Sequence, residues 1–111
     1  MSSPKKQIQM SELLPHAWAE LYHETSGSVI LDVRTADEFE SGYIKGAVNM
    51  DIHGGADFIA SIQSLDKSKS YFVYCRSGAR SGQACQLMSQ MGFSAVYNLE
   101  GGFLAWEGDL E

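Results

Sequence analysis

The chain is predicted to fold as one α/β domain with three layers, in which a central parallel sheet is flanked by helices on both faces. Short apolar runs alternate along the sequence with amphipathic segments of helical spacing, which is the order typical of this class. One run, Val29–Val33, is almost continuously apolar, as a parallel strand buried on both faces should be. A length of 111 residues is enough for one hydrophobic core but not for two.

Five segments are predicted to be strands, and five others to be helices. The strands are expected at Gln7–Met10, Val29–Val33, Ala47–Met50, Tyr71–Tyr74 and Ala95–Leu99. The helices are expected at Pro15–Glu24, from Thr35 to about Ser41, from Asp57 to about Leu65, at Ser81–Met91, and after Gly101. Residues 1–7 are expected to be a short polar tail and residues 8–111 the domain.

Local signals place several of these boundaries. Pro15 suits the first turn of a helix, and the segment Thr35 to Glu38 has the pattern of a capping box. Asp57 is a candidate N-cap for the third helix. The last helix carries Phe103, Leu104 and Trp106, whose bulk is expected to close the core.

The segment from Tyr71 to Arg80 contains the candidate catalytic residues. A β-prone run ends in Cys75, a tight turn containing Gly78 follows, and a helix is predicted to begin near Ser81. Free N–H groups and the dipole at a helix start stabilise anions, and Gly78 with positive φ could turn further N–H groups inward. Such surroundings lower a thiol pKa from about 8.5 to roughly 3.5–7.5. Cys75 is therefore the candidate nucleophile.

The three arginines of the chain lie in two short motifs. Arg76 and Arg80 flank the turn after Cys75, and Arg34 ends Leu31-Asp32-Val33-Arg34, which also reads as the carboxyl end of a strand. In a parallel sheet both motifs are expected to open into the same crevice. In a chain of net charge −6, this positive cluster predicts a small anionic ligand.

Composition excludes several other functions. An acidic chain whose one basic run is Lys5-Lys6 lacks the positive footprint that nucleic acids and anionic membranes require. No apolar run approaches the about 18 residues that span a bilayer, and the polar N-terminal residues do not resemble a signal peptide. A cytoplasmic protein is expected.

The remaining cysteine and the histidines offer no cofactor or metal site. Cys85 falls on the apolar stripe of the predicted helix Ser81–Met91, where a buried structural thiol is favoured over a resolving role. His16, His23 and His53 have no metal-ligand spacing relative to either cysteine.

Taken together, these motifs resemble a single-domain rhodanese from about Ile8 to the C-terminus. The resemblance is carried by Leu31-Asp32-Val33-Arg34, Glu38-Phe39, Gly42 to Asn49, the Cys75–Arg80 loop, and Leu99-Glu100-Gly101-Gly102 with Trp106. It implies a sulfurtransferase that carries sulfur as a cysteine persulfide, with thiosulfate or a similar anion as donor and cyanide or a thiol, including a thioredoxin-like protein, as acceptor.

By the same resemblance, Cys75 is the persulfide-forming residue. The active-site loop then comprises Arg76, Ser77, Gly78, Ala79, Arg80 and Ser81. Strand periodicity places Asp32 and Arg34 on one side of their strand. Asp32 is expected to help hold the loop, and Arg34 either pairs with a carboxylate or contacts substrate.

This chain has Tyr43 and Lys45 where the family usually has His and Pro, so no proton-transfer role is assigned to Tyr43. Persulfide formation needs only a thiolate that attacks sulfur, and the change does not affect that chemistry. Three alternatives are a persulfide carrier in a sulfur relay, a binding module without catalysis, and a phosphatase or arsenate reductase. The last is disfavoured because its loop arginine lies six positions after the cysteine, whereas Arg80 lies five after Cys75.

Overall fold

The structure, a computed structural model that describes residues 10–111, is built on a five-stranded sheet. The strands lie in the order β1-β5-β4-β2-β3, and every neighbouring pair is parallel. Their bounds are β1 Met10–Leu13, β2 Ser28–Asp32, β3 Val48–Asn49, β4 Ser70–Tyr74 and β5 Ala95–Leu99. The predicted parallel α/β class is confirmed.

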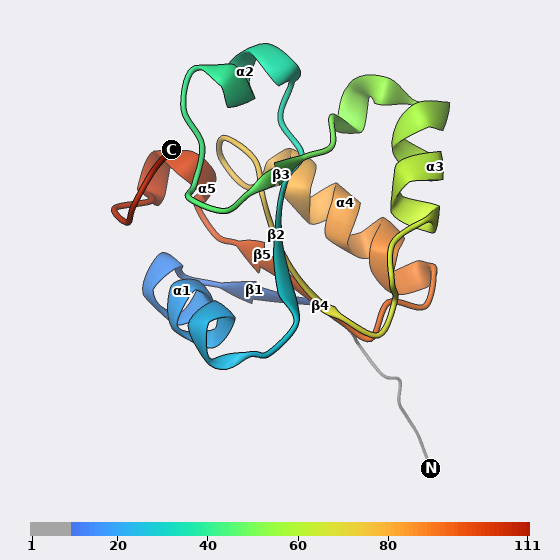
Figure 1. The fold of residues 1–111 in the computed structure, drawn as a ribbon, viewed down its shortest axis with the longest axis horizontal. Helices are drawn as coiled ribbons and strands as arrows, with labels where there is room; N and C mark the ends of the chain where they lie inside the picture. The colour runs from blue at the N-terminus through green and yellow to red at the C-terminus, as the bar shows by residue number, and fades with distance from the viewer. Residues whose placement is uncertain (1–9) are drawn as a thin grey trace.

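Helices cover both faces of this sheet. Figure 1 shows α1 and α5 on one side of the sheet and α3 and α4 on the other, with α2 near the carboxyl ends of the strands. The helices are α1 Pro15–Glu24, α2 Ala36–Glu40, α3 Ala56–Gln63, α4 Ala79–Gln90 and α5 Gly102–Ala105, and a 3₁₀ turn, η1, spans Ile52–Gly54. None of these helices is long and apolar enough to cross a membrane.

Alternation along β4 divides the core into two clusters. Tyr71, Val73 and Cys75 belong to the cluster beneath α3 and α4, whereas Phe72 and Tyr74 belong to the cluster beneath α1 and α5. Successive side chains of a strand point to opposite faces, so a strand buried on both faces is apolar throughout. The thiol and the neighbouring tyrosine hydroxyl are thereby separated by the sheet.

The first strand differs from its prediction. It runs from Met10 to Leu13 and pairs with β5, whereas the predicted strand Gln7–Met10 falls largely outside the described residues, as does the predicted boundary between tail and domain. The polar residues Ser11 and Glu12 interrupt the apolar pattern from which strands are predicted. They fit here because β1 is an edge strand, which tolerates polar side chains that a buried strand does not.

Two helix starts also differ from prediction. The N-cap of α3 is Gly55, with φ of +59°, and not Asp57, which lies in the first turn. Helix α4 begins at Ala79 instead of Ser81, because Gly78 adopts the left-handed conformation and turns the chain directly into the helix. The capping box of α2 is present as predicted, with Thr35 and Glu38 bonded reciprocally.

Candidate active site

Cys75 lies directly after β4, at the carboxyl edge of the sheet, and is 0% exposed. A three-residue turn, Arg76 to Gly78, carries the chain from this strand into α4. Gly78 has φ of +105°, as the sequence predicted, so the turn is tight and its backbone curls around the thiol.

Two hydrogen-bond donors point at the thiol sulfur. The backbone N–H of Gly78 lies 3.1 Å from Cys75 Sγ, and the buried hydroxyl of Ser81 lies 3.3 Å from it. Both donors come from the turn and the first helical residues, which the sequence singled out. The arrangement is suited to holding a negatively charged sulfur atom.

The same contacts set the ionisation of the thiol. Burial raises the pKa of Cys75, but the hydrogen bonds from the Ser81 hydroxyl and the Gly78 N–H, together with the nearby N–H groups of Ser81 and Ser77, outweigh it, and the net pKa lies below its ordinary value. A larger share of thiolate is therefore available at neutral pH than in a free cysteine.

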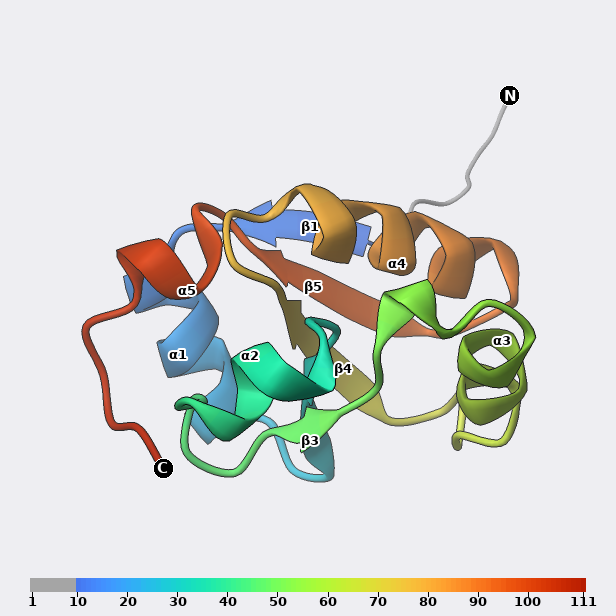
Figure 2. The ribbon, with the colours of Figure 1, turned by 90° about the horizontal axis from the view of Figure 1, so that it is seen from above.

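The carbonyl oxygens of the turn are drawn away from the thiol by α5. The N–H of Phe103 donates to the Cys75 carbonyl at 2.8 Å, and that of Leu104 donates to the Arg76 carbonyl at 3.1 Å. Figure 2 shows α5 beside the loop that joins β4 to α4. Gly102 permits this approach, since a Cβ there would lie 2.5 Å from the Arg76 carbonyl oxygen. With these carbonyl groups engaged by α5, N–H groups remain to face the sulfur.

Arg80 is held by a carboxylate from another element. Its guanidinium donates to both carboxylate oxygens of Glu38, at 2.8 and 3.1 Å, and Glu38 is fixed in turn by the capping box with Thr35. Beside Arg80, the pKa of Glu38 falls to about 2. The pair ties α4 to α2.

Arg34 lies on the other face of the sheet from the thiol. It is 3% exposed and forms a buried ion pair with Asp32, with nitrogen to oxygen distances of 2.6 to 3.0 Å. Of the two alternatives, pairing with a carboxylate is therefore the one observed. The prediction that Arg34 opens into the same crevice as the other arginines is wrong, because strand alternation turns it to the opposite face.

Asp32 reaches the active-site strand, but not the loop itself. It accepts a hydrogen bond from the Tyr74 hydroxyl at 2.6 Å, and Tyr74 immediately precedes Cys75. Within residues 10–111, its other side-chain hydrogen bonds go to Arg34. Asp32 thus supports the end of β4, next to the loop that it is expected to help hold.

The predicted positive cluster is reduced to one open charge. Asp32 neutralises Arg34 and Glu38 neutralises Arg80, whereas Arg76 is exposed and joins no salt bridge within residues 10–111. Ser77 and Ala79 are also exposed, so the outer rim of the loop is open to solvent. Arg76 is the cation available to an approaching anion.

The second cysteine is buried in the apolar cluster beneath α4. Cys85 is 0% exposed, and burial raises its pKa far above the ordinary value. Both cysteines are free thiols. These surroundings suit the structural role that the sequence favoured. In the described part of the chain, His, Cys, Asp and Glu side chains form no group of three that could hold a metal ion.

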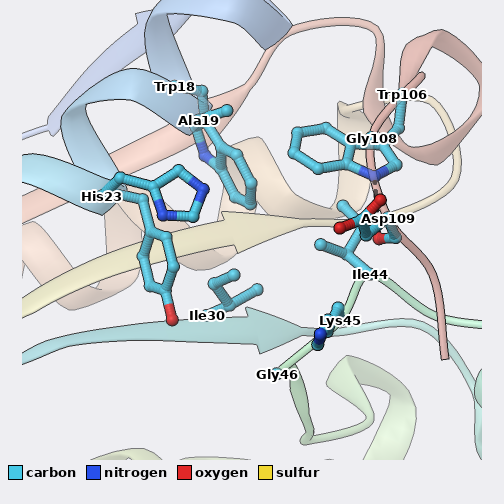
Figure 3. A pocket seen from close by; sticks show the side chains of 11 residues that line it. Trp18, Ala19, His23, Ile30, Ile44, Lys45, Gly46, Trp106, Gly108 and Asp109 are labelled. Carbon is cyan, nitrogen blue, oxygen red and sulfur yellow. Dashed lines mark hydrogen bonds between the residues drawn. The ribbon is translucent and has the colours of Figure 1, made fainter.

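A cavity of about 580 Å³ lies on the face of the sheet opposite the thiol. Figure 3 shows His23 across this space from Trp106 and Asp109, with Ile30 and Lys45 also lining it. No residue of the Cys75 loop lines it. This cavity is therefore separate from the Cys75 loop. Trp106 closes the core as expected, but Leu104 does not, since it is 65% exposed.

Sequence reasoning missed three contributors to the site. Glu38 was recognised as a capping residue but not as the partner of Arg80; Tyr74 and Asn98 were read only as strand residues. Asn98 donates to the Gly78 carbonyl at 3.1 Å. All three act across large sequence separations, and a carboxylate, phenol or amide alone does not indicate its distant partner.

Comparisons with known proteins agree with this geometry. A family model described as a rhodanese-like domain matches residues 15–109. The putative sulfurtransferase YtwF of Bacillus subtilis is 34% identical over 102 residues, covering 92% of this chain and 95% of the relative. The thiosulfate sulfurtransferase GlpE of Pseudomonas savastanoi is 41% identical over 80 residues, or 72% and 73% of the two chains.

A solved structure shares the same architecture. The crystal structure of a rhodanese-like domain protein from Staphylococcus aureus aligns with a TM-score of 0.78 at 27% identity, covering 92% of this chain and 97% of the other. The matched region contains the Cys75 loop and every strand from β2 to β5. With its fold, its loop and its relatives in agreement, this chain belongs to the family of rhodanese-like domains.

Proposed function

We propose that this protein is a sulfurtransferase that moves a sulfane sulfur from thiosulfate or a related donor to a nucleophilic acceptor. A persulfide on Cys75 carries the sulfur between the two. The observation that supports this most directly is the pair of donors at 3.1 and 3.3 Å from the sulfur of a thiol whose pKa is lowered. The printed names of the relatives, sulfurtransferase and thiosulfate sulfurtransferase, support the same chemistry.

In the first step, the Cys75 thiolate attacks the outer sulfur of thiosulfate. A bond forms between the two sulfur atoms, the sulfur–sulfur bond of thiosulfate breaks, and its electron pair leaves with sulfite. Cys75 then carries a terminal sulfur with one negative charge. In the second step, cyanide attacks that sulfur, and thiocyanate and the Cys75 thiolate are released; a thiol acceptor would take the sulfur as its own persulfide.

The loop residues have distinct roles in this cycle. Arg76, exposed and without an ion partner among residues 10–111, attracts the anionic donor. The N–H of Gly78 and the hydroxyl of Ser81 stabilise the negative sulfur. Arg80, held by Glu38, keeps the start of α4 in place. The backbone of Ser77 forms part of the turn, and that of Ala79 begins the helix.

The acceptor and the cellular setting belong to the same proposal. A small thiol, cyanide or a thioredoxin-like protein could take the sulfur, and a sulfur relay that uses a protein persulfide as donor is compatible with the same thiol. Two free cysteines favour the cytoplasm, where thiols are kept reduced. Nucleic acid and membrane are not proposed as partners.

Mass spectrometry of the intact protein tests the proposal. Thiosulfate should add one sulfur atom to the protein, and cyanide should remove it with formation of thiocyanate. Cys75→Ser should abolish both changes with the melting temperature preserved, whereas Cys85→Ser, at the buried second thiol, should still accept sulfur. Sulfur transfer by Cys75→Ser would refute the assignment, and faster hydrolysis of an aryl phosphate than sulfur transfer would favour the phosphatase alternative.

A further inference from the structure

We propose that Asn98 is a positioning residue that holds Gly78 so that its N–H points at the reactive sulfur. The inference deepens the proposed function and rests on it, since it assumes that Cys75 is the working thiol. Asn98 does not contact the sulfur; it acts through the loop.

The carbonyl oxygen of Gly78 is held from two directions. Nδ2 of Asn98, on β5, donates to it at 3.1 Å, and the N–H of Gly82 donates to it at 3.0 Å from within α4. The N–H of the same glycine donates to Cys75 Sγ at 3.1 Å. Gly78 therefore contacts the sulfur through its N–H and is anchored by two hydrogen bonds to its carbonyl oxygen.

Glycine is the residue for which such anchoring matters most. Gly78, at φ of +105°, has no side chain to limit rotation about its backbone bonds. Its Cα faces the turn after β5, where a Cβ would lie 3.4 Å from the Leu99 carbonyl oxygen and 3.5 Å from the Gly101 nitrogen. The amide of Asn98 fixes the carbonyl beside that turn and so restricts the direction of the N–H.

Glu12 fixes the orientation of the Asn98 amide. Glu12 and Asn98 are register partners in the parallel pairing of β1 with β5, and Nδ2 donates to the two carboxylate oxygens at 2.8 and 3.0 Å. The Gly78 carbonyl and the Glu12 carboxylate are both acceptors, so both require the donor end of the amide. Glu12 on the edge strand β1 thus orients Asn98, which in turn orients Gly78 in the loop.

The surroundings of the amide oxygen indicate that Asn98 does more than stabilise the fold. Asn98 is 1% exposed, and its Oδ1 is the one buried side-chain oxygen or nitrogen within residues 10–111 that has no hydrogen-bond partner. A buried acceptor without a partner lowers the stability of the fold. An apolar side chain of similar size would avoid that loss but could not hold Gly78.

The test is the pH profile with which iodoacetamide alkylates Cys75 in the full chain, read by peptide mass spectrometry. Asn98→Leu keeps the number and branching of the side-chain heavy atoms and removes the donor. We expect it to raise the midpoint by up to about one pH unit, the lower end of the range for a hydrogen bond to a charged group, and to slow sulfur transfer from thiosulfate at neutral pH by up to about three- to fourfold. The melting temperatures of the wild type and of Asn98→Leu should both lie above the assay temperature, so that both proteins are folded during the measurement.

Asn49→Leu is the matched control. Asn49 also donates from the end of a strand to two backbone carbonyls, those of Asp32 and Arg34, but it does not contact the loop. Its loss should lower stability without moving the midpoint. Glu12→Gln, which keeps an acceptor for Asn98, should also leave the midpoint in place, and Glu12→Ala should raise it less than Asn98→Leu does.

Two results would overturn the inference. One is an unchanged midpoint in Asn98→Leu, and the other is an equal shift in Asn49→Leu, which would indicate a general loss of order. If Asn98→Leu does not fold, Glu12→Ala at the exposed edge strand decides the question in the same way. Failure of the proposed function is distinguishable, because the wild-type protein would then show the alkylation profile but transfer no sulfur.

Discussion

Removing the hydroxyl of Ser81 should raise the pKa of the Cys75 thiol by about one unit. This hydroxyl is fully buried and lies 3.3 Å from Cys75 Sγ, and it is the first of the groups that lower the pKa of the thiol against the effect of burial. Hydrogen bonds to charged groups contribute about 1.5–3 kcal/mol. A long bond to sulfur belongs at the lower end, and about 1.4 kcal/mol corresponds to one pKa unit.

The effect on reactivity at neutral pH is smaller than the change in thiolate fraction. A rise of one unit lowers that fraction by up to about tenfold, but a more basic thiolate is intrinsically more nucleophilic, by about 2.5- to 3-fold per unit. The rate of alkylation of Ser81→Ala at neutral pH should therefore fall about three- to fourfold, whereas the plateau at high pH should rise.

The assay is the rate of carbamidomethylation of Cys75 as a function of pH, followed on the Cys75 peptide so that Cys85 does not contribute. Because Cys75 is buried, the absolute rate also reflects access, and the midpoint is the quantity to compare. Ser89→Ala is the control, since Ser89 lies on the same helix at a distance of about 12 Å along its axis from Ser81. Equal midpoints for wild type and Ser81→Ala would refute the view that this hydroxyl stabilises the thiolate.

Three further substitutions test the parts that surround the thiol, each by urea unfolding. Gly102→Ala should lower the free energy of unfolding by about 1–3 kcal/mol, since its Cβ would lie 2.5 Å from a loop carbonyl oxygen at φ of +62°; Gly27→Ala, with φ of +71° and open space around it, should cost less, and equal losses would argue against the close contact. Asp32→Asn should lower the free energy of unfolding by about 3–5 kcal/mol, because it leaves the buried guanidinium of Arg34 without a counter-charge. A loss below about 1 kcal/mol, at the level of a surface pair, would contradict this. Glu38→Gln should cost about 0.2–1 kcal/mol at neutral pH. Since the folded pKa of Glu38 is lowered from 4.5 to about 2, its contribution is present above 4.5 and lost as the pH falls toward 2, so a difference that persists in strong acid would exclude the ion pair as its source.

Local patterns were sufficient to predict the loop around Cys75 and its geometry. An apolar run, a cysteine, a glycine turn and a helix start follow one another within about ten residues, and the positive φ of Gly78 and the capping box at Thr35 were read from residue types alone. The parallel sheet was equally accessible, because a continuously apolar strand such as β2 reflects burial on both faces. These features depend on interactions between near neighbours in the chain.

Errors arose where distant residues decide the outcome. The arginines looked like one positive cluster, but strand alternation turns Arg34 to the opposite face, and Glu38 lies 42 residues from Arg80. Similarly, the first strand was predicted to end at Met10 because Glu12 is polar, whereas β1 continues to Leu13, and the partner of Glu12, Asn98, lies 86 residues away.

What the sequence by itself determined was the fold class, the family and the candidate thiol, because each is encoded in residue types close together in the chain. What only the tertiary structure decided was which charges stay free and which groups orient the loop. Charge compensation and the anchoring of a glycine turn depend on partners brought together by the sheet order β1-β5-β4-β2-β3 and by the approach of α5, and no local pattern encodes those distances.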